Sequence, residues 1–148
     1  MRGIEFTSRI ARDKRHALER LLFFNGCQDR VASDIVDVID RYGSPEIFDD
    51  GEGLRVRVAS LPDVQSLFAV ESQTGRPIGV AVYVRADLEH VSVLHLGVIE
   101  DYCSGGPNEG HSLLLRLVRE IRRSSRRMKG VRRLEVLYSA QRVRASAI

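Results

Sequence analysis

The order of secondary structure is plainest in residues 91–138, which read VSVLHLGVIEDYCSGGPNEGHSLLLRLVREIRRSSRRMKGVRRLEVLY. The apolar run Val91–Ile99 is typical of a buried strand, and 131–138 predicts a second one. Between them, after a loop at 101–112, apolar residues recur at helical spacing and Gly130 is expected to end the helix; they are Leu114, Leu117, Val118, Ile121 and Met128. A strand, helix and strand in this order close as a right-handed parallel crossover.

Three earlier segments also predict strands, at 54–59 (LRVRVA), 66–71 (SLFAVE) and 78–84 (IGVAVYV). Their connections are short, for example Ser72–Gly75, whereas parallel neighbours need a crossover of about a dozen residues or more. We therefore expect four antiparallel strands in a meander that starts at Leu54 and ends with the strand from Val91.

Two helices are expected before these strands. The first carries one apolar stripe and ends near Gly26; the stripe comprises Ile10, Ala17, Leu18, Leu21 and Leu22. The second runs from about Asp29 to Gly43 and is followed by an acidic loop at 48–53. The expected fold is α+β (α/β), with a mixed, mainly antiparallel sheet. We expect a single domain over 1–148, with a helical part at 1–53 and the sheet and crossover helix at 54–138.

Composition agrees with one globular domain, because 148 residues with 43% apolar and 29% charged side chains suffice for one core. The charge is unevenly distributed. Residues 116–133 hold eight arginines and Lys129 against Glu120, a net charge of +8, so the remainder carries −5 of the total of +3. The basic character therefore belongs to one helix.

Several classes of protein are not indicated. Cys27 and Cys103 lie far apart, and the four histidines form no ligand pattern, so we expect neither a disulfide framework nor a metal site. The first twenty residues lack an apolar segment, and no run approaches the roughly 20 apolar residues of a membrane span. We expect a cytoplasmic protein that does not associate with membranes.

The loop between the strand from Val91 and the basic helix has the composition of an anion site. Gly105, Gly106 and Gly110 let backbone N–H groups approach a ligand, and the start of the helix adds positive potential. Loops of this kind also use glycine for turn geometry alone, so the loop by itself leaves both interpretations open.

The succession of elements over about residues 66–139 resembles the central part of GNAT-type N-acetyltransferases. The resemblance rests on a strand end at 96–102 (LGVIEDY), the three loop glycines, and Leu113–Leu115 at the start of the helix. It implies a GNAT-like fold, acetyl-CoA as co-substrate, no metal, and a small-molecule or peptide amine as acceptor.

The resemblance also implies site residues. The backbone at Leu96–Val98 would hold the pantetheine arm and polarise the thioester carbonyl, and N–H groups from Gly106 through Ser112 would bind the pyrophosphate. The implied cofactor-binding set is Leu96, Gly97, Val98, Gly105, Gly106, Asn108, Gly110, His111 and Ser112.

Two catalytic residues follow from the same comparison. Glu100 could accept the proton of the amine, and Tyr138 could protonate the departing thiolate. Family bases on this strand lie an even number of residues before Val98, at Leu94 or Ser92. Alternation puts His95 on the opposite face, so we expect it to be a structural histidine.

The sequence departs from the family in two places, which supports an alternative. Cys103 or Pro107 stands where the pyrophosphate motif opens with Arg or Gln, and only ten residues follow Tyr138, too few for the family's closing helix and strand pair. The alternative is a non-catalytic binding module that uses the basic helix for an acidic protein or nucleic acid. A homodimer could complete the sheet. Nucleic acid is the less favoured partner because no aromatic residues are interleaved with the arginines.

Overall fold

The computed structural model describes residues 3–23, 38–58, 60–99, 102, 113–136 and 146–147. Its elements in chain order are β1 (Ile4–Thr7), the 3-10 turn η1 (Arg12–Lys14), α1 (Arg15–Phe23), β2 (Pro45–Asp49), β3 (Leu54–Val58), β4 (Gln65–Glu71), β5 (Pro77–Arg85), β6 (His90–Val98), α3 (Leu113–Ser125), β7 (Arg133–Val136) and β8 (Ser146–Ala147). Residues 38–42 are helical as well.

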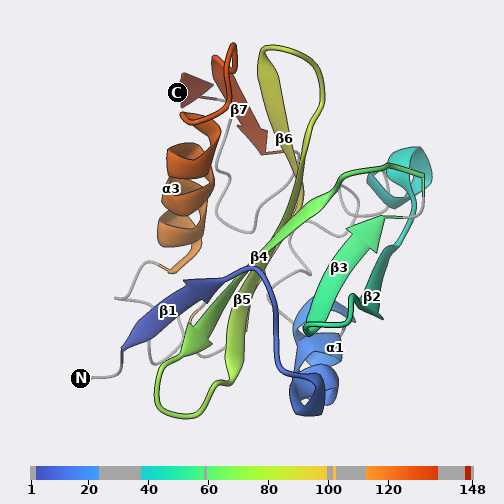
Figure 1. Ribbon diagram of the computed structural model, residues 1–148, viewed down its shortest axis with the longest axis vertical. Helices are drawn as coiled ribbons and strands as arrows, with labels where there is room; N and C mark the ends of the chain where they lie inside the picture. The colour runs from blue at the N-terminus through green and yellow to red at the C-terminus, as the bar shows by residue number, and fades with distance from the viewer. Residues whose placement is uncertain are drawn as a thin grey trace.

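Six strands form one mixed sheet in the order β1-β4-β5-β6-β7-β8 (Figure 1). All neighbours are antiparallel except β6 and β7, which are parallel and joined through α3. The expected α+β fold with a mainly antiparallel sheet and a parallel crossover is therefore confirmed. Strands β2 and β3 form a separate hairpin beside this sheet.

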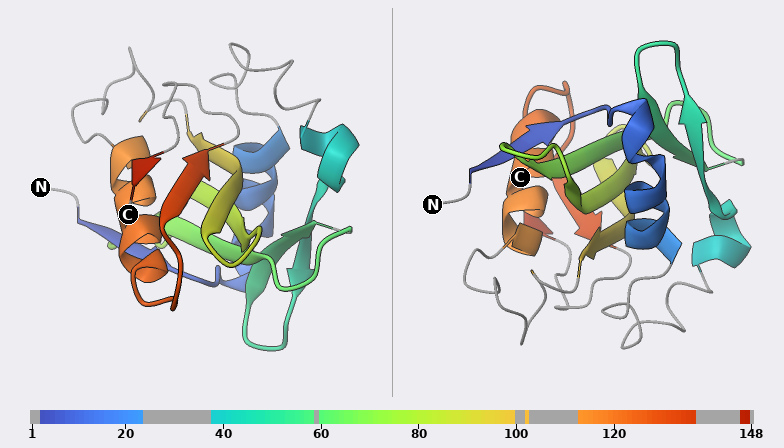
Figure 2. Two further views of the ribbon diagram at one scale, coloured as in Figure 1. Left: turned by 90° about the horizontal axis from the view of Figure 1, so that it is seen from above. Right: turned by 90° about the horizontal axis from the view of Figure 1, so that it is seen from below.

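Each face of the sheet carries its own apolar core, with α3 on one side and α1 on the other (Figure 2). The α3-side core includes Ala69, Ile78, Ala81, Val91, Val93, Leu96, Val98, Leu113, Leu117 and Ile121. The α1-side core includes Leu18, Leu21, Val56, Phe68, Val80, Val82 and Leu94. This division follows from the alternation of side chains along each strand.

Two expectations about the strands are wrong. Strand β1 was not expected, because four residues with one apolar pair give too little periodicity; it pairs with β4. Strand β3 does not open the meander but pairs with β2, so residues 1–53 contain two strands besides the helices. The segment expected as an acidic loop from Phe48 contributes its first two residues to β2.

The ends of two helices can be compared with the sequence. Gly43 ends the helical turn at 38–42 as expected: its φ is 100°, and its N–H donates to the Ile39 carbonyl at 2.8 Å. Helix α3 ends at Ser125, five residues before Gly130. The chain tightens there, because the N–H of Met128 donates to the Ser125 carbonyl three residues back.

The β2–β3 hairpin is attached to the segment that follows β1. Ile10 and Leu54 exchange two backbone hydrogen bonds of 2.9 and 2.8 Å. Arg9 Nε also donates to Asp50 Oδ2 at 2.7 Å. The backbone N–H of Glu52, and then the Arg9 guanidinium, hold the pKa of Asp50 below its usual value.

Candidate functional site

Strands β6 and β7 run parallel, and their pairing is described over four residue pairs. Its register runs from His90 opposite Arg133 to Val93 opposite Val136. From position 94 onward, β6 continues as a partner of β5, and the described part of the chain shows no further pairing with β7. Val136 is the last described residue of β7, because the structure describes no residue between 136 and 146, so these pairs are the register that it describes.

A β-bulge lies at this point. On β5, Val82 is opposite His95, and the next residue, Tyr83, is opposite Val93, so Leu94 has no counterpart. Val93 belongs to the α3-side core and Leu94 to the α1-side core. Because of the bulge, odd-numbered residues before Leu94 and even-numbered residues after it face the α3-side core.

The bulge corrects one expectation. Leu94 and Ser92 were expected to share the face of Val98, but Val98 lies in the α3-side core and Leu94 in the α1-side core. Ser92 pairs with Val84, which packs against the α1-side core. Counting by two from Val98 fails because Leu94 is an extra residue.

His95 lies on the α1 side, because its cross-strand partner Val82 belongs to that core. This agrees with the expectation of a structural histidine on the face opposite Val98. The imidazole is buried, and this burial lowers its pKa to about 4. His95 is therefore neutral at pH 7.

The three described positions of the implied cofactor set form the end of β6. Leu96 pairs with Ala81, Gly97 with Val80, and Val98 with Gly79. Their role toward a cofactor stays a prediction. The remaining site predictions lie outside the described residues; they are Glu100, Gly105, Gly106, Asn108, Gly110, His111, Ser112 and Tyr138.

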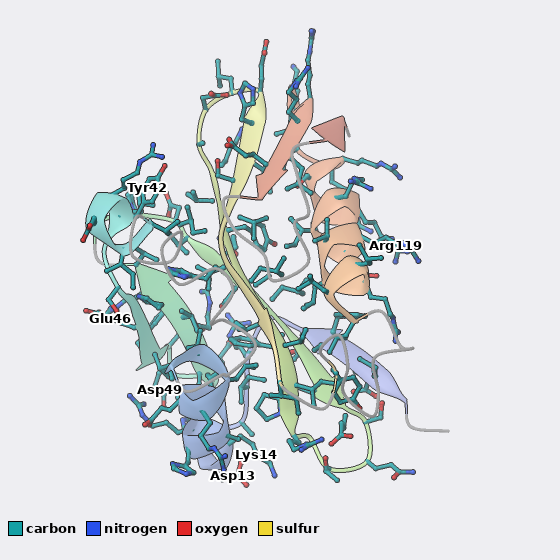
Figure 3. The ribbon with its side chains drawn as sticks, turned by 180° about the vertical axis from the view of Figure 1, so that it is seen from behind. Asp13, Lys14, Tyr42, Glu46, Asp49 and Arg119 are labelled. Atoms are coloured by element: carbon teal, nitrogen blue, oxygen red, sulfur yellow. The ribbon has the colours of Figure 1, made fainter. Side chains whose placement is uncertain are left out.

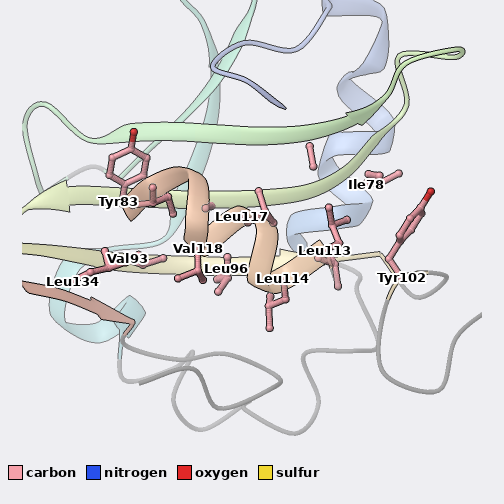
Figure 4. Close-up of a cluster of buried hydrophobic side chains, with 14 of the residues drawn as sticks. Ile78, Tyr83, Val93, Leu96, Tyr102, Leu113, Leu114, Leu117, Val118 and Leu134 are labelled. Carbon is pink, nitrogen blue, oxygen red and sulfur yellow. The ribbon is translucent and has the colours of Figure 1, made fainter. Parts of the chain in front are cut away.

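The start of α3 lies against the end of β6. A Cβ on Gly79 would come within 2.9 Å of Leu117 Cδ1 and 3.4 Å of Leu113 Cδ2. Since Gly79 pairs with Val98, the first turns of α3 pack beside the last residue of β6 (Figure 4 shows Leu113 and Leu117 over the sheet). The absence of a side chain at Gly79 permits this close approach.

Tyr102 is held in a buried polar cluster that the sequence did not reveal. Its ring is 2% exposed, and its hydroxyl donates to Glu71 Oε2 at 3.2 Å. The other carboxylate oxygen of Glu71 accepts from Arg76 Nε at 2.7 Å and from Thr74 Oγ1 at 3.4 Å. Tyr102 thereby connects the chain just after β6 to the β4–β5 turn. No local pattern could have indicated a pair 31 residues apart.

The arginines of α3 differ in exposure, and Arg116 and Arg122 are half-buried. Arg119 and Arg123 are exposed, and Arg119 points outward in Figure 3. Arg123 contacts Glu120 at 3.3 Å, and the guanidinium of Arg116 stacks over the Phe6 ring at 5.4 Å. Exposed ion pairs such as that of Arg123 with Glu120 contribute little to folding.

Among the residues that the structure describes, no three His, Cys, Asp or Glu side chains gather closely enough to hold a metal ion. None of the described helices is long and apolar enough to cross a membrane.

Solved structures of acetyltransferases have similar folds. An acetyltransferase from Streptococcus agalactiae 2603 is 17% identical over 90% of this chain and 72% of its own, with a TM-score of 0.47. A protein from Desulfovibrio desulfuricans assigned to the GNAT family is 20% identical over 90% and 72%, with a TM-score of 0.42. Nourseothricin acetyltransferase is 17% identical over 62% and 56%, with a TM-score of 0.35.

No family model and no curated protein matches the sequence. The three solved structures are 17–20% identical to this chain.

Proposed function

We propose that the protein is an acetyl-CoA-dependent N-acetyltransferase that acts on a primary amine. The observation that carries the proposal is the packing of the first turns of α3 beside Val98 at the end of β6, where Gly79 leaves room for Leu113 and Leu117. Strand backbone can hydrogen-bond an extended ligand, and the N-terminal end of a helix attracts a phosphate, so this juxtaposition suits a coenzyme at the end of β6.

Each predicted site residue has a role in the proposed acetyl transfer. Acetyl-CoA supplies the acyl group as a thioester. Backbone groups of Leu96–Val98 align the arm and polarise the carbonyl, and Glu100 takes a proton from the attacking amine. The C–N bond forms as the C–S bond breaks, and Tyr138 donates a proton to the thiolate. The N–H groups between Gly106 and Ser112 bind the pyrophosphate.

His95 is excluded as the base by its position. It lies on the α1 side of the sheet, opposite the face of Val98. This leaves Glu100 as the acidic residue nearest the end of β6 in the sequence.

Calorimetry and thermal unfolding test the proposal directly. Acetyl-CoA or CoA at 100 times its dissociation constant should stabilise the fold by about 2.7 kcal/mol. ADP shares the pyrophosphate but lacks the arm, so it serves as the matched control and should bind more weakly. Well-folded protein that shows no shift with either coenzyme would refute the proposal.

A second candidate function follows from the basic face of α3. The exposed Arg119 and Arg123 suit an acidic protein or nucleic acid, in which case the domain would bind without catalysing. Such binding should weaken steeply with salt and disappear when Arg122, Arg123, Arg126 and Arg127 are neutralised. Binding that is insensitive to salt would exclude it.

A homodimer is part of the proposal. Within the described part of the chain, the two-residue strand β8 lies beside β7 and is the last strand of the sheet. A strand from a second copy could extend the sheet there, as edge strands commonly allow. Sedimentation equilibrium would distinguish a dimer from a monomer.

A further inference from the structure

The basic face of α3 is a continuous stripe of exposed side chains. It consists of Leu115, Arg119, Arg123 and Arg126, whose spacing of four, four and three residues keeps them on one side of the helix. Arg126 still belongs to the helical turn, because its N–H donates to the Arg122 carbonyl at 3.1 Å. The opposite side of the helix is buried and comprises Leu113, Leu114, Leu117, Val118, Ile121 and Ser125. Figure 3 shows Arg119 projecting from α3 away from the sheet.

The charge around this stripe is strongly one-sided. Residues 116–129 hold six arginines and one lysine against Glu120, a net charge of +6. Glu120 contacts Arg123 at 3.3 Å, whereas Arg119 and Arg126 have no ion pair within the described part of the chain. Clustered like charges repel one another and reduce the stability of the fold. The basic face is therefore suited to a partner that carries several negative charges.

One apolar side chain belongs to the same stripe. Leu115 is 48% exposed, and it precedes Arg119 by about one helical turn. Among the described residues, Leu88 of the β5–β6 turn is the other large apolar side chain that is exposed. The basic face thus offers a partner one apolar contact beside its charges.

This composition discriminates between classes of negatively charged partner. Single-stranded nucleic acids are held by aromatic side chains that stack on the bases, and residues 113–129 contain no aromatic residue. Phosphate contacts to a duplex would engage the arginines but not Leu115. An acidic amphipathic helix presents carboxylates and apolar side chains at the same spacing of three and four residues. It can therefore match the stripe, which spans about 16 Å, over about three turns.

We propose that the basic face of α3 binds an acidic amphipathic helix of a partner protein. Carboxylates of the partner pair with Arg119, Arg123 and Arg126, and one of its apolar side chains packs on Leu115. The assignment rests on the second candidate function and names its partner. It does not require acetyl transfer, because the residues of α3 that lie beside the end of β6 are on the buried side of the helix.

Fluorescence anisotropy with two labelled helical peptides tests this assignment. Both peptides carry the same glutamates along one face; the first has leucines between them, and the second has serines in place of the leucines. The native chain should bind the leucine peptide about threefold more tightly than the serine peptide, and salt should weaken the binding of both. Equal binding of the two peptides by the native chain would overturn the assignment.

A charge variant with a matched control locates the site. Arg119→Gln/Arg126→Gln should bind the leucine peptide about tenfold more weakly than the native chain. The control Arg20→Gln/Arg41→Gln removes the same charge from exposed arginines outside α3, and its affinity should stay within about twofold of the native value. Equal losses in both variants would mean that only the total charge matters, which contradicts a site on α3.

The apolar contact has its own matched pair. Leu115→Ala should abolish the preference for the leucine peptide, whereas Leu88→Ala, which shortens the other exposed leucine, should retain it. Both leucines are exposed, so neither variant removes a residue of the core. A preference that persists in Leu115→Ala would refute the proposed contact.

A duplex DNA of equal charge is the remaining probe. If the duplex binds and neither peptide does, the assignment fails, and the second candidate function stands with a nucleic acid as its partner. If none of the three probes binds, both fail. The acetyltransferase proposal is measured separately by the binding of CoA, so its failure would leave the result with the peptides unchanged, and failure of the peptides to bind would leave that proposal standing.

Discussion

His95 makes the folded state sensitive to acid. Its pKa is lowered to about 4 by burial, whereas in the unfolded chain it should return to about 6.5. As the pH falls below 6.5 the unfolded chain takes up a proton that the folded protein does not, so acid favours unfolding. The stability associated with neutral His95 is complete above pH 6.5 and is lost as the pH falls toward 4.

The size of this effect follows from the two pKa values. Each pKa unit corresponds to about 1.4 kcal/mol, so the whole window is equivalent to about 3 kcal/mol. Between pH 7 and pH 5 the free energy of unfolding should fall by about 2 kcal/mol. The carboxylates with lowered pKa, such as Asp50 and Asp87, lose their contributions below pH 4, outside this interval.

Urea unfolding at pH 7 and pH 5 measures this loss. Replacement of the imidazole in His95→Gln should remove most of it, whereas the control His16→Gln, which removes an exposed imidazole of α1, should retain it. Should His95→Gln prove too unstable to measure, a histidine NMR titration of the native protein gives the same information. A ring that titrates above pH 6 in the folded protein would refute the argument.

Three further predictions concern the packing around the site. Gly79→Ala should lower the free energy of unfolding, measured in urea, by about 1–3 kcal/mol, because its Cβ would lie 2.9 Å from Leu117 Cδ1. The double variant Gly79→Ala/Leu117→Ala should lose less stability than the sum of the two single variants. Strict additivity would contradict this contact. Tyr102→Phe should lower the free energy of unfolding by about 1–2 kcal/mol and weaken CoA binding, because the hydrogen bond to Glu71 is lost. An unchanged CoA affinity in calorimetry would show that this hydrogen bond does not support the proposed CoA site. Arg123→Gln should change the free energy of unfolding by no more than about 0.5 kcal/mol, and a larger change would mean that the basic face supports the fold.

Strong periodicity explains what the sequence could predict. Strands β5 and β6 are long and continuously apolar, and the stripe of α3 is unambiguous, so these elements were expected within a few residues of their bounds. Their parallel crossover followed from connection length and handedness alone. Strand β3 also has clear alternation, but alternation shows only that one face is wet and does not select a partner strand, so its assignment to the meander was wrong.

The features that sequence reasoning missed depend on contacts between distant residues. A bulge at Leu94 cannot be recognised within a continuous apolar run. When the face of a residue is inferred by counting in twos along β6, a count that passes Leu94 assigns the residue to the wrong face. The hydrogen bond between Tyr102 and Glu71 likewise arises only when the chain is folded. The same holds for a depression of about 520 Å³ on the α1 side of the sheet, which is lined by Tyr42, Leu61 and Leu94 among others.

The bulge also determines where β6 can change in length. With Leu94 omitted, the strand would alternate regularly, so that Val91, Val93, Leu96 and Val98 would all still reach the α3-side core. Position 94 is therefore a site at which a related chain could lose one residue and keep the α3-side core, while the α1-side core would lose the buried Leu94 side chain. A gap at this position in a future alignment would therefore mark relatives whose α1-side core is packed differently although the pairing of β5 with β6 is regular.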